Sequence, residues 1–429
     1  MKKAVVVGSG AGGAAAAHEL QGIFDVTILE AGREFSPFSG NLSRLEKLRK
    51  SGLFFEERMI GLLFPAMRIR KTRDRMILVN GVGTGGTTTI SAGNGIRMDG
   101  DLKKIGIDLD SEFEELSREV GLSTAHQARW SDTTRKLFER CIGLDLHPVP
   151  IPKMGEYERC TGCGRCIFGC KNRVKWDSRR YIEDAVNKGA RLVTGCVVKK
   201  VAVSKGRAEG VFVKHGPGIR FISADLVVLA AGGFSTPVIL QNSGYQCEDR
   251  LFVDPVLCVA AELEGCAQSR EVTMPFVIQK EGYIVSPYFD YLSFFFNKKW
   301  RYPAQDIYGI MIKLADSNTG SVHGRNIRKE LTTQDRVKLD EAVEFCAGLF
   351  EHLGVSRRDT FLGTVNAGHP GGMLPITVSE ADTLHHSSLP DNLYVSDATL
   401  LPRSLGNPPI LTIMALAKKV IRSCMRKVA

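Results

Sequence analysis

The sequence lacks several features that would place it in particular protein classes. No apolar run approaches the length that crosses a bilayer, so we expect no transmembrane segment. The chain opens Met1-Lys-Lys-Ala-Val and runs straight into an expected strand, with no signal peptide before it. Internal repeats and low-complexity tracts are also absent. We therefore expect a cytoplasmic protein, whose 43% hydrophobic residues are enough for a large core.

Positive charge is in moderate excess, but nothing in the sequence directs it to nucleic acid. Lys and Arg number 57 against 47 Asp and Glu, which gives a formal net charge of +10. The basic residues are dispersed and no nucleic-acid-reading motif accompanies them, so we expect no nucleic-acid partner. The excess could steer an acidic electron carrier onto the surface, or it could simply be solvated.

Cysteine is not scarce, and its distribution does not fit a small disulfide scaffold. The chain has 11 cysteines, an odd number. Four of them share one short stretch with the spacing C-x2-C-x2-C-x3-C: Cys160, Cys163, Cys166 and Cys170. This spacing is typical of a loop that holds an iron–sulfur cluster through thiolates. Zinc sites normally use two separated cysteine pairs, so a zinc knot is a lesser alternative, as is a set of metal-free buried thiols.

The N-terminal segment carries the pattern of a dinucleotide-binding strand, turn and helix. A short β-branched strand leads into Gly8-Ser-Gly10-Ala-Gly-Gly13 and then into an Ala-rich helix. We expect Gly8 to permit the tight turn, Gly10 to let the backbone approach a pyrophosphate, and Gly13 to allow close helix–strand packing. Glu30 ends the second expected strand and would accept hydrogen bonds from ribose hydroxyls, which disfavours NADP.

Two further segments favour FAD over NAD. Residues 80–90 form a second Gly- and Thr-rich stretch that can pass close to a flat ring system. Its candidate cofactor contacts are Gly83, Gly85 and Gly86. The later apolar run Leu226–Gly233 reads as another buried strand that ends in small residues, with Gly232 as a further candidate.

These segments, and above all the C-terminal third, resemble the glucose–methanol–choline (GMC) oxidoreductase family of FAD enzymes. Asn392–Pro402 and Gly406–Ala417 are similar to the family's closing signature. The cysteine loop resembles that of the iron–sulfur-containing bacterial FAD-dependent sugar and alcohol dehydrogenases of this family. Those proteins use three cysteines for a three-iron cluster. Because Cys163 adds a fourth thiolate here, the resemblance leads us to predict a [4Fe–4S] cluster.

The resemblance also implies roles for individual residues. His369, in a Gly-His-Pro-Gly-Gly turn, would be the catalytic base that takes a hydroxyl proton as hydride leaves carbon for the flavin. Asn407, made rigid by the prolines that follow, would hold the substrate oxygen. Asp397 and Pro408 would lie beside the cofactor. Ile90 stands where the family often has an asparagine, and Asn94, a few residues on, would lie beside the cofactor instead.

The expected fold class is α/β. It combines a discontinuous Rossmann-like FAD-binding domain, an antiparallel-sheet substrate domain and a cysteine-rich cluster-binding insert. The assigned ranges are 1–105, 186–250 and 385–429 for the FAD-binding domain, 106–185 for a largely helical insert, and 251–384 for the substrate domain. Within the substrate domain, the apolar pattern predicts strands over Tyr283–Phe296 and Asp306–Ala315, followed by a helix over Thr333–Leu353.

The function we expect is that of an FAD-dependent dehydrogenase that oxidises an alcohol or sugar hydroxyl by hydride transfer to flavin N5. Electrons would then pass through the [4Fe–4S] cluster to an external carrier, such as a ferredoxin-like protein, or to a companion subunit. Two alternatives stay open: a flavin alcohol oxidase whose cysteines are structural, and an electron-transfer subunit of a larger redox complex.

Overall fold

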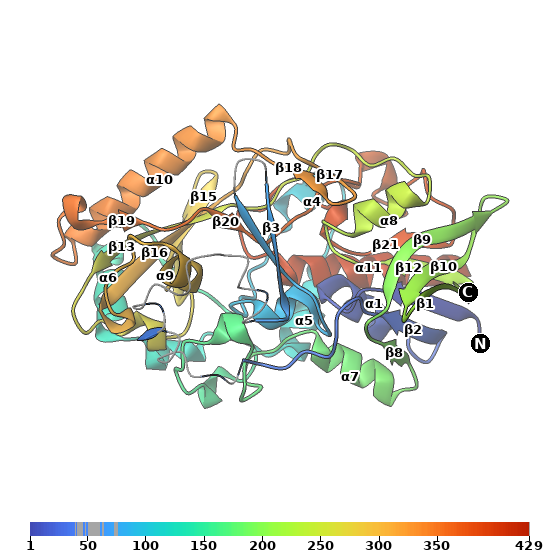
Figure 1. The fold of residues 1–429 in the computed structure, drawn as a ribbon, viewed down its shortest axis with the longest axis horizontal. Coiled ribbons are helices and arrows are strands. Elements are labelled where there is room, and N and C mark those ends of the chain that lie inside the picture. Colours follow the sequence, from blue (N-terminus) through green and yellow to red (C-terminus); the bar gives the residue numbers. More distant parts are fainter. Residues whose placement is uncertain are drawn as a thin grey trace.

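A five-stranded parallel sheet organises one half of the molecule (Figure 1). The structure is a computed structural model that describes residues 1–38, 40, 46, 47, 49, 61, 64–72 and 76–428. The strand order in the sheet is β21-β12-β1-β2-β8. The strands are β1 (Lys3–Val7), β2 (Asp25–Leu29), β8 (Arg191–Val193), β12 (Leu226–Leu229) and β21 (Leu393–Val395). Both ends and the middle of the chain thus meet in one sheet, which agrees with a discontinuous Rossmann-like arrangement.

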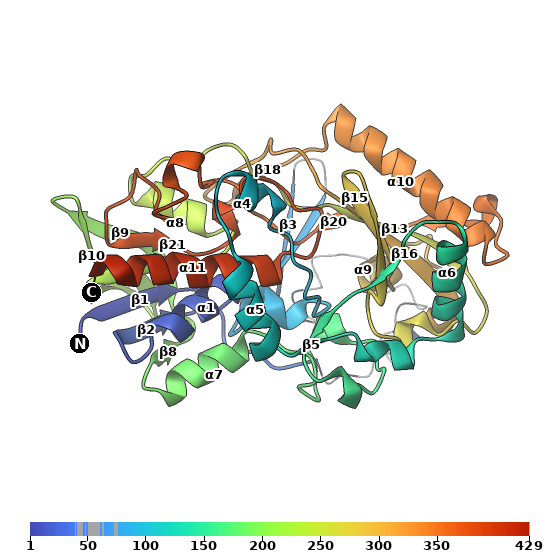
Figure 2. The same ribbon diagram turned by 180° about the vertical axis from the view of Figure 1, so that it is seen from behind.

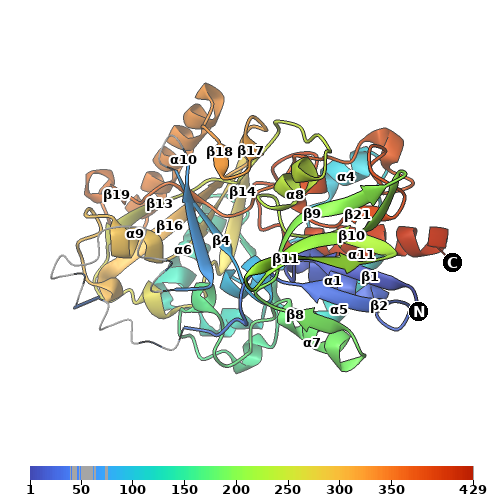
Figure 3. The same ribbon diagram turned by 45° about the vertical axis from the view of Figure 1, so that its right-hand side comes forward.

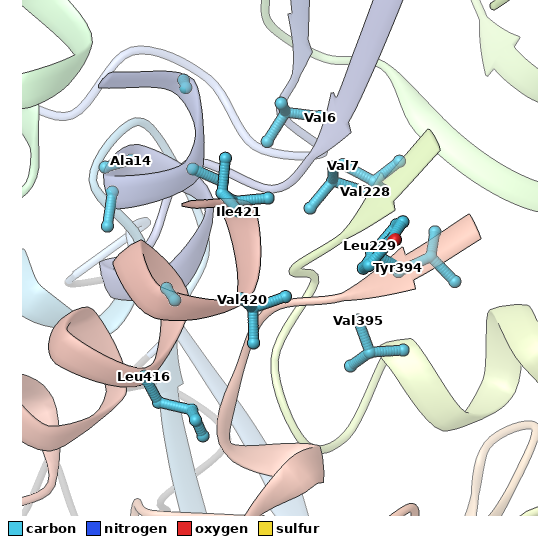
Figure 4. Close-up of a cluster of buried hydrophobic side chains, with 14 of the residues drawn as sticks. Val6, Val7, Ala14, Val228, Leu229, Tyr394, Val395, Leu416, Val420 and Ile421 are labelled. Atoms are coloured by element: carbon cyan, nitrogen blue, oxygen red, sulfur yellow. The ribbon is translucent and has the colours of Figure 1, made fainter. Parts of the chain in front are cut away.

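Helices cover one face of this sheet (Figure 2). The alanines of α1 (Ala11–Leu20) are small, so this helix packs closely against both the strands and α11 (Ile410–Val428). Figure 4 shows apolar side chains of β1 and β12 gathered with those of α1 and α11 in one buried cluster. α5 (Asp110–Glu119) and α7 (Arg179–Asn187) flank this helical layer.

A three-stranded antiparallel sheet covers the other face of the parallel sheet (Figure 3). Its strands are β9 (Val197–Ser204), β10 (Arg207–His215) and β11 (Gly218–Ser223). Val211 and Val213 of β10 lie in the same core as the parallel strands, while Glu209 and Lys214 are exposed.

The second half of the molecule is built on a nine-stranded, mainly antiparallel sheet. Its order is β3-β4-β20-β13-β16-β15-β14-β6, with β19 also paired to β13. The strands are β3 (Met67–Lys71), β4 (Ile77–Gly81), β6 (Val149–Pro150), β13 (Val256–Glu262), β14 (Phe276–Lys280), β15 (Tyr283–Pro287), β16 (Ile307–Leu314), β19 (Phe361–Leu362) and β20 (Asn366–Ala367). Side chains of β13 alternate between two cores: Leu257 and Val259 lie in one, Cys258 and Ala260 in the other.

The predicted helix over 333–353 is present as α10 (Thr333–Glu351), which packs on the central strands β13, β16 and β15. It begins at a capping box: Thr332 accepts a hydrogen bond from the Asp335 N–H, and the Asp335 carboxylate accepts one from the Thr332 N–H. The remaining elements are α4 (Gly100–Lys104), α6 (Asp132–Gly143), α8 (Thr236–Asn242), α9 (Tyr291–Phe296), β5 (Leu122–Ser123), β7 (Lys153–Met154), β17 (Ser321–His323) and β18 (Asn326–Arg328). Within the described residues, no helix is long and apolar enough to cross a membrane.

The expected strand over Tyr283–Phe296 was wrong in its second half. β15 ends at Pro287, and α9 follows because the Asp290 side chain caps it, accepting a hydrogen bond from the Leu292 N–H at 3.0 Å. Two of the assigned ranges also differ in structure from what we expected. β3 and β4 lie within 1–105 but pair into the second sheet, and much of 144–178 forms turns and short 3₁₀ segments rather than α-helix.

Candidate active site

One cavity is lined by residues of both large sheets, and most of the predicted site residues lie along it. Its volume is about 1190 Å³. It starts at the carboxyl end of β1, which has β2 on one side and β12 on the other. Open α/β sheets bind ligands at such a switch point. The cavity continues to His369, on the loop after β20, and to Pro408, just before α11.

The turn between β1 and α1 is packed so tightly that only glycine fits at several positions. A Cβ on Gly12 would lie 1.7 Å from the carbonyl oxygen of Ser396, and one on Gly13 would lie 2.1 Å from that of Gly8. Gly8 itself has a φ of +103°. Gly8 and Gly10 line the cavity, whereas Gly13 contributes by packing the helix against the strand, as predicted from its spacing.

The N-terminus of α1 is open toward the cavity. Gly10 is its N-cap and has no side chain to bond the first free N–H groups, and Gly10, Ala11 and Gly12 all line the cavity. Free N–H groups at a helix N-terminus bind phosphate oxygens. Gly86 faces Gly10 across this point, and a Cβ on Gly86 would lie 2.9 Å from the Gly10 Cα.

The other two glycines of the second Gly-rich stretch hold the loop rather than line the cavity. The Gly85 N–H donates to the Ser9 hydroxyl at 3.1 Å, and the Ser9 hydroxyl lies 3.4 Å from the Gly83 carbonyl oxygen. Gly83 and Gly85 both have positive φ values, +148° and +92°. The structure therefore brings Gly86 to the cavity and places the other two behind it.

Glu30 is buried at the wall of the cavity, at the end of β2. One carboxylate oxygen accepts from the Ser9 N–H at 3.2 Å and from the Ser9 hydroxyl at 2.5 Å. The other accepts from the Gly32 N–H at 2.8 Å. These bonds fix the carboxylate at the cavity wall.

Asp397 and Gly232 also line the cavity and are bonded to each other. The Asp397 carboxylate accepts from the Gly232 N–H at 2.8 Å, from the Thr236 hydroxyl at 2.6 Å and from the Thr399 N–H at 2.8 Å. Burial raises the pKa of Asp397, and these hydrogen bonds oppose the rise. The carboxylate thus ties the ends of β12 and β21 together beside the cavity.

Asn94 lies on the cavity wall, with a buried lysine behind it. Lys153 Nζ donates to the Asn94 side-chain oxygen and to the Thr273 carbonyl oxygen, the latter at 2.6 Å. Burial lowers the pKa of Lys153 to about 7. Lys153 was not anticipated from the sequence.

His369 is held by two charged side chains on one side of its ring. Lys313 Nζ lies 2.5 Å from His369 Nδ1, and an Asp254 oxygen lies 3.3 Å from the same nitrogen. Lys313 and Asp254 form a buried ion pair at 3.1 Å, and Ser404 donates to the other Asp254 oxygen. Burial, and next the charge of Lys313, lowers the pKa of His369, so its ring is neutral near pH 7.

Sequence reasoning also missed Lys313 and its partner Asp254. Lys313 is the one charged residue in the otherwise apolar strand β16, and every residue of that strand is buried. A lone charge in a buried strand is costly unless it is paired. The single lysine in this apolar run could therefore have indicated a buried ion pair. Its partner Asp254 lies in the loop just before β13, far from it in sequence, and no local pattern links the two.

The structure does not bring Asn407 into the cavity. Its amide pairs with that of Gln279: Gln279 Nε2 donates to Asn407 Oδ1 at 3.1 Å, and Asn407 Nδ2 donates back at 3.3 Å. This exchange satisfies a buried amide. Pro408, the next residue, does line the cavity. Lys313, not Asn407, is the polar side chain beside His369.

The four loop cysteines lie close to the cavity without lining it, although Ile167 and Phe168 between them do line it. Cys160 and Cys170 pack against a small buried cluster that includes Tyr157, and Cys163 is exposed. All four are free thiols. Across the described residues, no group of three or more His, Cys, Asp or Glu side chains is arranged to hold a metal ion. The thiols therefore do not form a ready-made cluster site.

Comparison with known proteins agrees with the cavity's geometry. The profile of the family described as GMC oxidoreductase matches residues 108–258. Over this segment the chain is similar to GMC oxidoreductases. It is an FAD-dependent oxidoreductase of the class that acts on CH–OH groups. Three features of the cavity fit FAD: the open α1 N-terminus, the buried acid at the end of β2, and the Gly10–Gly86 contact that any side chain would block.

Individual relatives match nearly the whole length of this chain. The Methanocaldococcus jannaschii protein MJ1450 is 26% identical over 98% of this chain and 99% of its own length. The long-chain-alcohol oxidase FAO1 of Arabidopsis thaliana is 24% identical over 96% of this chain and 65% of its own length. The crystal structure of pyridoxine 4-oxidase from Mesorbium loti superposes with a TM-score of 0.74 at 16% identity, over 98% of this chain and 99% of that one. That likeness shows a shared fold.

Proposed function

We propose that this protein is a GMC-type oxidoreductase that oxidises an alcohol whose hydroxyl proton is accepted by His369. The observation that carries the proposal is the place of His369 in the same cavity as the α1 N-terminus and Gly86, with Nδ1 occupied by protein groups and Nε2 left for the cavity. A neutral imidazole can take a proton from a hydroxyl group when its Nε2 lone pair is free. When bound, FAD supplies the hydride acceptor, flavin N5.

The chain's own residues would bind the two ends of the cofactor and shield the reaction. The N–H groups of the first turn of α1 would hold the pyrophosphate, and Glu30 would hold a ribose. Gly232, Asp397, Pro408 and Asn94 line the same cavity as the α1 N-terminus and His369, which supports their assignment to the cofactor.

The cavity near the second sheet favours an alcohol with an apolar body over a sugar. Phe168, Tyr291 and Phe295 line it, and Phe168 stacks edge-on against Tyr291 at 4.8 Å between ring centroids. Aromatic walls bind apolar groups and leave sugar hydroxyls without partners. The name of FAO1, a long-chain-alcohol oxidase, is consistent with this choice.

The test is anaerobic reduction of the bound flavin, followed by its visible absorbance. We expect aliphatic or aromatic alcohols to bleach the flavin and sugars to leave it oxidised. His369→Gln should slow bleaching by about 10²-fold or more with flavin content unchanged. His385→Gln is the matched control, because His385 is buried against the Pro390 carbonyl oxygen outside the cavity. Equal rates in the His369 variant and the wild type would exclude His369 as the base.

The electron acceptor is a separate part of the proposal. The cysteine spacing supports a [4Fe–4S] cluster held by Cys160, Cys163, Cys166 and Cys170, with an external electron carrier or a companion subunit beyond it. Against this stands the lack of a preformed ligand group among the described residues. Iron and acid-labile sulfide analysis of anaerobically purified protein decides between them. About four irons per flavin would support the cluster, whereas flavin without iron, together with hydrogen peroxide formation during turnover, would favour an oxidase with structural cysteines.

A further inference from the structure

We propose that Lys313 and Asp254 are positioning residues that set the tautomer of His369, and so decide whether its Nε2 can accept the substrate's proton. The proposal rests on the role of His369 given above and adds the groups that control it. Neither residue belongs to a motif of the sequence, and the structure alone brings them to the histidine.

The contacts to His369 converge on one ring nitrogen. Nδ1 is 2.5 Å from Lys313 Nζ and 3.3 Å from Asp254 Oδ2, so the lysine is the nearer partner. An ammonium group is only a donor. Beside a protonated Lys313, Nδ1 must therefore be the acceptor. A neutral imidazole carries one proton, which then sits on Nε2.

This tautomer has a direct chemical consequence. With its proton on Nε2, His369 presents a donor to the cavity and cannot accept the hydroxyl proton. Once Lys313 has lost its own proton, Nδ1 can carry one and donate it to Asp254. Nε2 then has a free lone pair, and the substrate O–H proton can move to it while Asp254 stabilises the resulting imidazolium. Lys313 thus switches His369 between a donor state and an acceptor state.

The surroundings of Lys313 make its proton removable at moderately high pH. Lys313 is buried, and burial lowers its pKa while Asp254 opposes the fall. The other acid that acts on Lys313 is Asp316, which is engaged by a second buried lysine, Lys329, at 2.6 Å. In the part of the chain that the structure describes, the ionisable groups around Lys313 are His369 and the members of these two ion pairs.

The first test needs no substrate. Holoenzyme labelled with ¹⁵N-histidine gives long-range ¹H–¹⁵N spectra in which the two tautomers and the imidazolium have different patterns. His369 is assigned by the signal that disappears in His369→Gln. We expect the Nε2-protonated neutral ring near pH 7, converting to the Nδ1-protonated ring as the pH rises. A ring protonated on Nδ1, or on both nitrogens, near pH 7 overturns the proposal.

The second test removes the lysine. In Lys313→Met we expect Nδ1 to become protonated with Asp254 as its acceptor, and the rise of alcohol oxidation with pH to move to lower pH by at least about one unit. Lys329→Met is the matched control, since it also removes a buried lysine from a buried aspartate but does not contact His369. An unchanged tautomer in Lys313→Met, or the same change in both variants, overturns the proposal.

Failure of the proposed function remains distinguishable from failure of this inference. If no alcohol reduces the flavin, the assigned reaction is wrong, yet the spectra still report whether Lys313 sets the tautomer. If alcohols reduce the flavin but His369 is Nδ1-protonated in the wild type, the reaction stands and the switch is refuted.

Discussion

Replacing Gly12 with alanine should lower the free energy of unfolding, although alanine is the better helix former. Gly12 lies in the first turn of α1, where exchange for alanine would ordinarily gain up to about 1 kcal/mol. Here the added Cβ would lie 1.7 Å from the Ser396 carbonyl oxygen and 3.3 Å from the Asp397 Cα. Carbon and oxygen normally approach no closer than about 3.3 Å, so the helix and the 396–397 backbone must separate by roughly 1.5 Å.

Such overpacking typically costs about 1–3 kcal/mol, and a rigid backbone partner places this case at the upper end. After the helix-propensity gain is subtracted, we expect a net loss of about 2 kcal/mol in the free energy of unfolding. The separation also displaces Asp397 from the cavity wall, so the variant should retain less FAD. The measurements are the urea midpoint of unfolding and the ratio of flavin to protein absorbance after purification.

Gly100→Ala is the matched control for this prediction. Gly100 begins α4, and a Cβ there would meet no atom within 4 Å. We expect Gly100→Ala to be neutral or stabilising by up to about 1 kcal/mol, with normal FAD content. The packing argument would be refuted if Gly12→Ala had the same urea midpoint and flavin content as this control.

Three further perturbations test other parts of the structure. Glu30→Ala removes the acceptor of three hydrogen bonds, so we expect a loss of about 2–3 kcal/mol and at least tenfold weaker FAD binding in a titration of the apoprotein; unaltered affinity would contradict the ribose assignment. Burial raises the pKa of Asp290 to about 6, so its contribution to stability is full below the unfolded value of 3.8 and is lost as the pH rises through 6. As the pH rises from about 4 to about 7, the free energy of unfolding of Asp290→Asn should therefore increase by up to about 3 kcal/mol relative to that of the wild type, measured by urea unfolding. If the difference in free energy between the two proteins did not change with pH, this burial effect would be refuted. Lys418 is fully buried and pairs with Glu19 at 2.7 Å, Glu115 at 3.0 Å and Glu119 at 3.2 Å. Lys418→Met should therefore lower the free energy of unfolding by about 3–5 kcal/mol in urea unfolding. An unchanged free energy of unfolding would mean that the packing of α5 against α11 does not depend on this network.

Much of the first sheet was predictable because its signals are local. A β-branched strand, a glycine turn and an Ala-rich helix follow one another within the N-terminal segment, and the structure places Gly8, Gly10 and Glu30 at the cavity. The strand predicted over 283–296 failed in its second half because consecutive aromatic residues do not alternate, and the Asp290 cap starts a helix instead.

The surroundings of the histidine could not be predicted in the same way. His369 was singled out from its own flanking residues. Lys313, Asp254 and Ser404 come from three other segments, and the burial that makes their contacts strong exists only after the second sheet has formed. Asn407 shows the converse: its flanking sequence suggested a substrate contact, but packing supplies Gln279 as a partner for its amide.

The sequence by itself determined the dinucleotide-binding turn, the acid after the second strand, the histidine turn and the family resemblance, because each depends on residue types at short, fixed spacings. Tertiary structure alone decided which polar groups share the cavity with that histidine. It placed Lys313 and Asp254 at one nitrogen of the His369 ring, turned Asn407 away, and left the four loop thiols without a common metal-binding geometry. The physical reason is that charges and amides separated by long stretches of chain interact strongly only where folding has excluded water around them.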